Sequence, residues 1–270
     1  MKVVSPEREK ARTEATAMML MEAHALREQF VPFAKLREIN DIAAAYRVQD
    51  AYWRRQMSRD NTQVAGFKIG LTTKKMQEMC GIDSPVAGYV PANRIYTSGV
   101  AIDSKRQIHL GVEFEIAVKL GRDFPFRPYA YTQQEIAQSV VAVAPAVELV
   151  DDRHCDYATL EALSLIADNS WNEGIVVGTW QEPPKDLGAV EGIVTLDGQE
   201  LGRGFGRDAL GHPYVPLTWL ANFRAGTDRP LKKGDVVMTG SLVRTNFPTQ
   251  ACKYHYDLTG LGSVDVEVTF

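Results

Sequence analysis

The first glycine of the chain is Gly66, and the sequence changes character at this position. Residues 6–63 are rich in Ala, Glu, Arg, Met and Leu, and their apolar residues recur at helical spacing. After Gly66, short runs rich in β-branched and aromatic residues alternate with Gly, Pro, Asp and Asn. The sequence therefore predicts an α+β fold, with a helical N-terminal region (1–65) and a β-rich core (66–270) that act as one functional unit.

The boundaries of several elements can be predicted from local signals. Asn40 and Asp41 offer an N-cap for the second N-terminal helix, and the run 60–62 is a turn that ends it. Strands are predicted over residues 65–71, 94–96, 107–120, 190–196, 235–239 and 263–270. Helices within the core are predicted over 132–143, 157–167 and 217–224.

Charge and cysteine content exclude several classes of protein. The chain has 30 Lys and Arg against 34 Asp and Glu, a net charge of −4 that does not favour a nucleic-acid partner. Its three cysteines are far apart and odd in number, so neither a zinc pair nor a closed disulfide set is expected. The sequence shows neither a signal peptide nor a membrane-length apolar run, so we expect a cytoplasmic protein without a membrane partner.

Three glutamates are candidate metal ligands. Glu113 and Glu115 alternate with apolar residues in a predicted strand and therefore share one face, which in the ordinary case faces solvent. Glu148 lies within the apolar run 140–150, where burying a carboxylate costs several kcal/mol unless it has a partner. Oxygen ligands of this kind suit Mg²⁺ or Mn²⁺. The alternative for Glu148 is an ion pair with a neighbouring Arg or Lys, for which Arg153 is a candidate.

Other polar residues stand at positions where they can serve a site. Lys68 lies in an apolar, glycine-flanked strand, either as an edge lysine facing water or as a cation that stabilises substrate charge or moves a proton. Asp168 and Asn169 follow a predicted helix, where capping is the ordinary role. Thr239 and Gly240 follow a short strand, and they form either a plain turn or a site for a small carboxylate.

Taken together, these segments resemble the 2-keto-4-pentenoate hydratase branch of the fumarylacetoacetate hydrolase superfamily. The matching segments occur in the family's order and span most of the chain. They are Gly66-Phe-Lys68-Ile-Gly-Leu-Thr-Thr, Gly81-Ile-Asp-Ser-Pro85, Glu113-Phe-Glu115-Ile-Ala, Pro145-Ala-Val-Glu148, Ala167-Asp-Asn169, Leu210-Gly-His212-Pro, Thr239-Gly240 and Gly260-Leu-Gly-Ser-Val264.

The resemblance implies a mixed, rolled β-sheet core, a helical N-terminal region and a homo-oligomer, which in this family can associate with a pathway enzyme. It implies a divalent metal, Mg²⁺ or Mn²⁺, bound by Glu113, Glu115 and Glu148. Lys68 matches the family's active-site lysine. Thr239 and Gly240 match a segment near the bound 2-oxo acid, and Asp168 and Asn169 match a loop beside the pocket.

The resemblance favours a metal-dependent hydratase of meta-cleavage aromatic catabolism, which adds water to a 2-hydroxy-2,4-dienoate to give a 4-hydroxy-2-oxo acid. Two departures concern the substrate: Val86 stands where vinylpyruvate hydratases carry an acid, and Ser170-Trp171 stands where relatives often read Ala-Ser. Val86 resembles the 4-oxalocrotonate decarboxylases of the family, so decarboxylation of 2-oxo-3-hexenedioate is the alternative reaction.

The sequence leaves two further alternatives for the function open. It also does not show which residue would bind the far end of the substrate. An acylpyruvate hydrolase needs a general-base dyad, for which His24 and Glu28 are a poor candidate, and an inactive partner subunit is the non-enzymatic alternative. A second substrate carboxylate would need a cation, and the candidates are Arg94, Arg106, Arg153 and Arg207.

Overall fold

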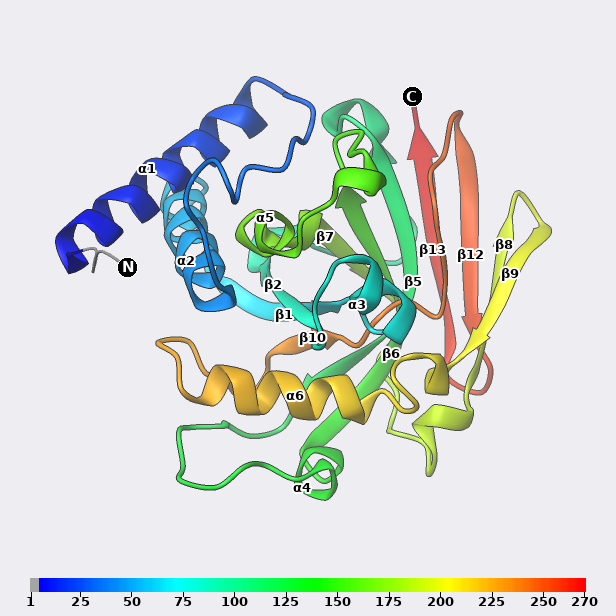
Figure 1. Ribbon diagram of the computed structural model, residues 1–270. Coiled ribbons are helices and arrows are strands. Elements are labelled where there is room, and N and C mark those ends of the chain that lie inside the picture. The colour runs from blue at the N-terminus through cyan, green and yellow to red at the C-terminus, as the bar shows by residue number, and fades with distance from the viewer. Residues whose placement is uncertain (1–4) are drawn as a thin grey trace.

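The computed structural model describes residues 5–270, so the first four residues of the predicted helical region lie outside the described residues. Helices α1 (Pro6–Ala25) and α2 (Ile42–Arg59) pack against each other at one side of the molecule (Figure 1). Asp41 caps α2 as predicted, since its Oδ1 accepts a hydrogen bond of 2.7 Å from the backbone N–H of Ala44. The helical N-terminal region is therefore confirmed over its described part.

Two mixed sheets form the core. The larger, eight-stranded sheet has the order β2-β1-β10-β5-β6-β7-β3, with β11 also paired to β5. The smaller sheet has the order β4-β13-β12-β8-β9 and lies on the side opposite α1 and α2 (Figure 1). The strands are β1 (Val64–Gly70), β2 (Val86–Pro91), β3 (Ile95–Thr97), β4 (Val100–Asp103), β5 (Leu110–Leu120), β6 (Val140–Asp151), β7 (Asn172–Val177), β8 (Glu191–Leu196), β9 (Gln199–Phe205), β10 (Val236–Met238), β11 (Val243–Asn246), β12 (Cys252–Leu258) and β13 (Gly262–Thr269).

Shorter helices connect and cover these strands. The α-helices of the core are α3 (Lys74–Met79), α4 (Gln133–Ala137), α5 (Ala162–Ala167) and α6 (Tyr214–Ala225). The single-turn 3₁₀ helices are η1 (Ala92–Arg94), η2 (Ser104–Arg106), η3 (Tyr157–Thr159), η4 (Asn169–Trp171), η5 (Leu187–Ala189) and η6 (Gly206–Asp208). In the described part of the chain, no helix is long and apolar enough to cross a membrane.

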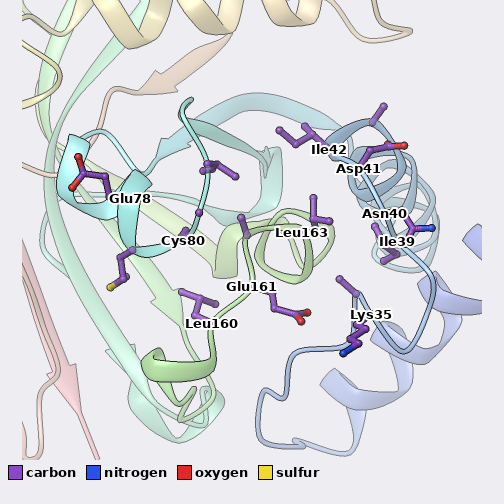
Figure 2. Close-up of a pocket in the computed structure, with 16 residues that line it drawn as sticks. Lys35, Ile39, Asn40, Asp41, Ile42, Glu78, Cys80, Leu160, Glu161 and Leu163 are labelled. Carbon is purple, nitrogen blue, oxygen red and sulfur yellow. The ribbon is translucent and has the colours of Figure 1, made fainter.

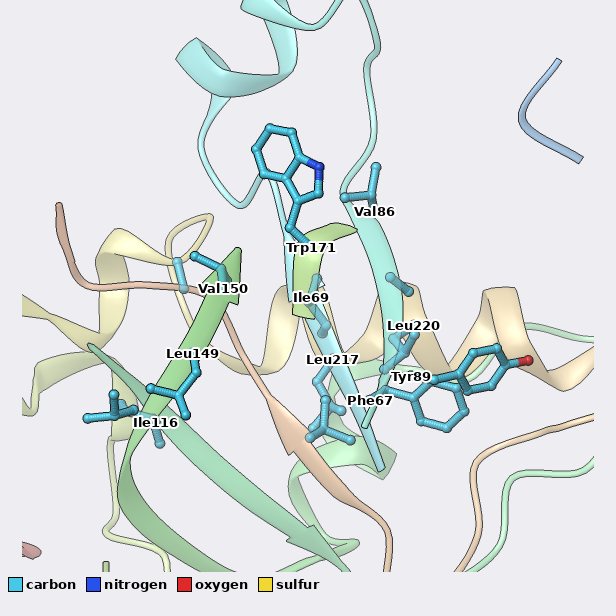
Figure 3. Packing of buried hydrophobic residues seen from close by; sticks show 14 of the residues in the cluster. Phe67, Ile69, Val86, Tyr89, Ile116, Leu149, Val150, Trp171, Leu217 and Leu220 are labelled. Atoms are coloured by element: carbon cyan, nitrogen blue, oxygen red, sulfur yellow. The ribbon is translucent and has the colours of Figure 1, made fainter. Parts of the chain in front are cut away.

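The larger sheet is rolled, as the resemblance implied, because β2 comes back into contact with β7 and with η4. On its outer face, Phe67 and Ile69 of β1 join the same buried cluster as Leu217 and Leu220 of α6 (Figure 3). The inner face has a separate cluster of mostly small apolar residues, including Ala117 of β5. Small side chains there leave room for the polar groups described below.

Strand alternation decides which side chains of β5 enter each face. Phe114 contacts the rings of Tyr254 and Tyr256 on β12, which joins the two sheets through the outer face. Its neighbours Glu113 and Glu115 therefore point to the inner face of the roll. The predicted separation of apolar and acidic residues in this strand is confirmed.

The predicted elements of the core are partly correct. Each predicted strand is present with shifted ends, but the helix predicted over 132–143 is wrong, because α4 ends at Ala137 and β6 begins at Val140. The helix predicted over 157–167 is split into η3 and the short α5. The strands that the sequence did not indicate are β2, β4, β6, β7, β9, β11 and β12.

Candidate metal and substrate site

Glu113, Glu115 and Glu148 converge on the inner face of the rolled sheet. One carboxylate oxygen of each lies within 4.8 Å of the others, and among residues 5–270 this is the one group of three or more His, Cys, Asp or Glu side chains with such spacing. The register of β5 and β6 brings them together, since Glu113 lies directly opposite Glu148 in the antiparallel pair. Glu148 is completely buried and Glu115 is 1% exposed, so the solvent-facing alternative is wrong for Glu115.

Lys68 is the cation of this cluster. It lies on β1, which has partners on both sides, and its side chain is 4% exposed, so it is not an edge lysine facing water. Its Nζ is 3.2 Å from Oε1 of Glu148. Glu148 therefore forms an ion pair with a neighbouring cation, as the alternative interpretation predicted, but that cation is Lys68, and the candidate Arg153 is wrong because it pairs with Asp168.

The protonation of the cluster reflects burial and mutual repulsion. Burial raises the pKa of Glu148 to about 7, although Lys68 opposes this increase. Burial and the charges of Glu148 and Glu113 raise the pKa of Glu115 well above its usual range. Burial alone would lower the pKa of Lys68, but the charges of the three glutamates raise it above its ordinary value. The site therefore lacks enough positive charge to compensate the three carboxylates, and Lys68 stays an ammonium ion.

The donor set fits a divalent cation. If all three carboxylates were ionised, they and the one ammonium would carry two negative charges in excess in a buried site, and a dication would neutralise this excess. Within the described chain, Oε2 of Glu148 is buried without a hydrogen-bond partner, as expected of an oxygen whose partner is a metal ion. The remaining carboxylates are held in place, since Oε1 of Glu113 accepts a hydrogen bond of 2.6 Å from the Thr245 hydroxyl.

Gly240 contacts this cluster through its backbone, and Thr239 fixes the same turn to β5. The N–H of Gly240 donates a hydrogen bond of 2.8 Å to Oε2 of Glu115, while the Thr239 hydroxyl donates to the carbonyl of Ile116. Gly240 has a φ of 112°, and a Cβ there would lie 2.2 Å from Oγ1 of Thr72. This position therefore requires glycine.

Asp168 and Asn169 belong to the loop that carries the far wall of the site. Asn169 Oδ1 accepts a hydrogen bond of 2.6 Å from the N–H of Tyr89, and its Nδ2 donates to the carbonyl of the same residue. The Asp168 carboxylate is buried between Arg153 and His24, whose Nε2 lies 2.7 Å from Asp168 Oδ1. Neither the Asp168 side chain nor the Asn169 side chain lines the pocket that lies beside Lys68.

The same loop has an unusual backbone. Asn169, Ser170 and Trp171 have consecutive positive φ values of 56°, 49° and 63°, in the left-handed region that costs non-glycine residues free energy. The two hydrogen bonds from the Asn169 side chain to the backbone of Tyr89 on β2 hold this conformation, which directs Ser170 and Trp171 into the pocket. The next residue, Asn172, donates a hydrogen bond of 2.9 Å to Oε1 of Glu148.

A pocket of about 120 Å³ opens beside the carboxylates and Lys68. Apart from Lys68 and Glu113, the described residues of its lining include no Lys, Arg, His, Asp or Glu, so none of the four candidate arginines contributes to it. The lining residues are Lys68, Gly70, Leu71, Met76, Val86, Glu113, Val150, Tyr157, Leu160, Leu165, Ser170, Trp171 and Thr245. The pocket thus joins a charged end to an apolar end.

Two other hollows lie apart from this cluster. Arg94, Arg106 and Arg153 line a polar pocket of about 160 Å³ that also includes His24 and Glu173. A more open hollow of about 1020 Å³ lies between the segment before α2, the end of α3 and the start of α5 (Figure 2). Figure 2 shows Glu78 on the opposite side of this hollow from Glu161 and Lys35, and among the described residues no group of three ligating side chains converges here.

Sequence reasoning missed several residues of the site. Asn172 and Thr245 contact the glutamates, while Tyr157 and Leu160 form part of the pocket wall. The polar residues carried no motif that would distinguish them from ordinary loop residues. Trp171 was noted only as a departure from the family pattern. Its position in the motif that begins at Ala167 was the available signal that its side chain lines the pocket.

Comparisons with known proteins show the family to which the chain belongs. The family model described as fumarylacetoacetate (FAA) hydrolase C-terminal matches residues 58–268, and the chain belongs to this family. It is 32% identical to a 2-keto-4-pentenoate hydratase of Burkholderia vietnamiensis (strain G4 / LMG 22486) over 94% of this chain and 96% of the relative. It is 30% identical to 2-keto-4-pentenoate hydratase 1 of Dechloromonas aromatica (strain RCB), over 93% and 95%.

The fold also matches a solved structure of the same superfamily. A 4-oxalocrotonate decarboxylase from Pseudomonas putida G7, complexed with magnesium and adipate, superposes with a TM-score of 0.88 over 99% of this chain and all of that chain. Its sequence identity is 22%, so this likeness concerns the fold. The relatives' names agree with the predicted hydratase, and the structural neighbour carries the name of the predicted alternative.

Proposed function

We propose that this protein is a divalent-metal-dependent hydro-lyase that adds water to a 2-hydroxy-2,4-dienoate and yields a 4-hydroxy-2-oxo acid. The observation that carries the proposal is the convergence of three glutamates and Lys68 at one end of a pocket whose other end is apolar. Hydratase relatives at about 30% identity over nearly the whole chain support the same reaction. The metal is Mg²⁺ or Mn²⁺, which prefer oxygen ligands.

The apolar end of the pocket favours a hydratase over a decarboxylase of 2-oxo-3-hexenedioate. That enedioate has a second carboxylate, whose burial without a cation costs several kcal/mol. The single cation of the described lining is Lys68, which is already paired with Glu148. Val86, Leu160 and Trp171 instead suit a short hydrocarbon tail. Val86, which resembles the decarboxylases, keeps that reaction as the second candidate.

Each residue of the site has a distinct part in the proposed reaction. Glu113, Glu115 and Glu148 would hold the metal, which when bound supplies Lewis-acid stabilisation of the negative charge on the 2-oxygen. Lys68 places a fixed ammonium beside the same charge, and its raised pKa keeps it protonated. Asn172 orients Glu148. The apolar wall excludes bulk water from the diene, so that these charges act at low dielectric.

The remaining site residues support this arrangement. We propose that Gly240 and Thr239 hold Glu115 and the turn beside the substrate carboxylate, and that Asn169 fixes the loop that bears Ser170 and Trp171. Asp168 supports the loop indirectly, because its carboxylate pairs with Arg153 and with His24. The pair with His24 anchors the loop to α1. Because α1 thereby supports a loop of the pocket, we propose that regions 1–65 and 66–270 act as one functional unit.

We also propose that the protein forms a homo-oligomer and that this oligomer can associate with a pathway enzyme. Large apolar side chains are exposed on the described surface, among them Val31 and Leu36 of the segment that joins α1 to α2. Exposed apolar groups of this size favour protein contacts when they gather on one face. Light scattering after size-exclusion chromatography would measure the assembly, and a monomer at micromolar concentration would contradict this part of the proposal.

The test of the reaction uses the purified protein with Mg²⁺ and, separately, with Mn²⁺. Incubation with 2-hydroxypenta-2,4-dienoate should bleach the dienol absorbance and give a 4-hydroxy-2-oxo acid detectable by NMR. Incubation with 2-oxo-3-hexenedioate should release little CO₂. Rapid CO₂ release with no hydration would replace the hydratase with the decarboxylase, and no turnover of either compound with bound metal would indicate an inactive partner subunit.

A further inference from the structure

A chain of hydrogen bonds begins at Tyr157, which is 40% exposed at the wall of the substrate pocket, and ends at His109. Tyr157 lines the pocket, and its hydroxyl donates a hydrogen bond of 2.9 Å to Oδ2 of Asp152. The other oxygen of this carboxylate, Oδ1, lies 2.7 Å from Nδ1 of His109. A carboxylate only accepts hydrogen bonds, so Nδ1 carries the proton in this pair. The His109 side chain is one-third exposed, whereas Asp152 is 1% exposed.

The protein holds this chain of residues firmly in place. His109 is stacked between Phe247, at a ring-centroid distance of 4.4 Å, and His154, at 4.3 Å. Asp152 also accepts a hydrogen bond of 3.0 Å from the N–H of His154, which has a left-handed φ of 56°. The Tyr157 ring meets Trp171 edge to face. Packing of this kind fixes the rotamers that proton transfer requires.

The titratable neighbours of Asp152 come from three segments of the chain. They are His109 before β5, Tyr157 on η3, and His154 and Cys155 in the same turn. Tyr157 and the candidate metal ligand Glu113 line the same pocket, and burial and the charge of Asp152 raise the pKa of the Tyr157 hydroxyl. The hydrogen-bonded chain thus begins beside the reacting centre.

Ketonisation of a 2-hydroxydienoate breaks the enol O–H bond and forms one C–H bond on the diene. We propose that Tyr157 and Asp152 move this proton and that His109 positions Asp152, an inference that rests on the proposed function. Oη of Tyr157 accepts the enol proton while its own proton passes to Oδ2 of Asp152. The concerted transfer avoids a free phenolate.

Protons and electrons balance within the substrate and these side chains. The electron pair of the broken O–H bond becomes the π bond of the new carbonyl, and the diene electrons shift toward the carbon that is protonated. Asp152 then returns its proton to Tyr157, which donates a proton to that carbon. Asp152 and Tyr157 regain their starting states, so no other reactant is consumed.

The first test is Tyr157→Phe, which keeps the ring against Trp171 and removes the hydroxyl. General acid–base catalysis of this kind contributes about 100-fold or more to rate, so kcat should fall by that order while KM and Mg²⁺ affinity change little. The solvent deuterium isotope effect on the remaining rate should also change, because a different group then moves the proton. Wild-type kcat in this variant would overturn the proposal.

The second test is His109→Phe, which keeps the stack on Phe247 and His154 but removes the N–H donor to Asp152. Loss of a donor to the ionised form raises the pKa of a carboxylate. The acid limb of the kcat profile should therefore move to higher pH. A purely structural role would lower kcat at every pH without moving that limb, and such a result would also overturn the proposal.

A matched control is available on the smaller sheet. His255 on β12 likewise places Nδ1 2.7 Å from a carboxylate oxygen, that of Asp265, and both side chains are about half exposed. His255→Phe should leave kcat and its pH profile unchanged. If wild-type protein hydrates the dienoate and Tyr157→Phe is equally fast, only the relay fails. If wild-type protein with bound Mg²⁺ turns over no dienoate, the proposed function fails and the relay with it.

Discussion

Nζ of Lys68 lies 3.2 Å from Oε1 of Glu148, and the two side chains are at most 5% exposed. Removal of one partner from a buried ion pair commonly costs about 3–5 kcal/mol, because the other charge is left without compensation. Lys68→Met should therefore lower the free energy of unfolding of the chelator-treated protein at pH 8 by about 3 kcal/mol.

The same variant separates the part of Lys68 in catalysis from its part in stability. Mg²⁺ should restore most of the lost stability, since a dication neutralises the three carboxylates, but kcat should stay at least about 100-fold below wild type. Urea unfolding with and without Mg²⁺, together with steady-state kinetics, would measure both. Recovery of kcat upon addition of Mg²⁺ would show that Lys68 is only structural.

Glu148→Gln tests the metal ligand set. The substitution keeps the shape and the contact with Asn172 but removes one ligand charge, so Mg²⁺ affinity and turnover should each fall by orders of magnitude. The metal-free protein should be as stable as wild type or more stable, because the repulsion among the three carboxylates falls while Lys68 keeps the compensating charges of Glu113 and Glu115. Calorimetric titration with Mg²⁺ would measure affinity, with Glu200→Gln, an exposed partner of Arg203, as the control. Near-wild-type turnover would count heavily against the site.

The raised pKa of Glu148, about 7 without metal, gives a pH dependence with a definite sign. The folded state binds a proton at pH values where the unfolded state, with an ordinary glutamate pKa near 4.3, does not. This group therefore lowers the stability of the metal-free protein as pH rises from about 4.3 to about 7, with no further change above that.

Metal binding should show the complementary dependence. Since a proton competes with Mg²⁺ at Glu148, affinity should rise by up to about tenfold per pH unit below pH 7 and flatten above it. Protonation of Glu115, whose pKa is also raised, can only steepen this slope. Calorimetry at pH 6.0 in buffers of different ionisation enthalpy would count the released protons. Equal affinity at pH 6 and pH 8 would contradict the raised pKa values.

The sequence predicted the local part of this site and missed the part that depends on distant contacts. The two-residue period of β5 correctly placed Glu113 and Glu115 on one face. Convergence with Glu148 depends on the β5–β6 register, which the spacing between the strands does not reveal. The family resemblance supplied that step, because it carried the non-local pairing in the order of its motifs.

The errors in secondary structure have a similar cause. Residues 132–143 combine a true capping box, formed by Thr132 and Glu135, with the start of an apolar strand, so helical periodicity was extended too far. Strand β6 is covered on both faces, and its continuous apolar sequence lacks the alternation that identifies a half-exposed strand. Asn169 and Trp171 have left-handed φ values that only tertiary contacts sustain, so local propensity gave no sign of them.

Gly240→Ala tests the backbone that holds Glu115. A methyl group would meet Oγ1 of Thr72 at 2.2 Å and would require a φ of 112°, so the turn must move and its N–H must leave Glu115. We expect a loss of about 2–3 kcal/mol in stability and weaker Mg²⁺ binding. Gly198→Ala is the control, because its φ is 82° but a methyl group would meet nothing within 4 Å. It should cost about 1 kcal/mol and leave Mg²⁺ binding intact.

Leu160→Arg tests the role of the apolar end of the pocket, where the described lining has no cation. It asks whether that lack of a cation disfavours a substrate with a second carboxylate. Leu160 is half-buried in the wall of the pocket, so its replacement puts a guanidinium where a second carboxylate could reach it. Binding of 2-oxo-3-hexenedioate should tighten about tenfold, as one charge-assisted hydrogen bond would give, while kcat/KM for 2-hydroxypenta-2,4-dienoate should fall.

Leu163→Arg is the matched control, because Leu163 lines the large open hollow but not the substrate pocket. Competition by the dicarboxylate in the hydration assay would measure the effect in both variants. Equal inhibition of wild type and Leu160→Arg would mean that the far end of the substrate lies elsewhere. The apolar wall would then no longer argue for the hydratase over the decarboxylase.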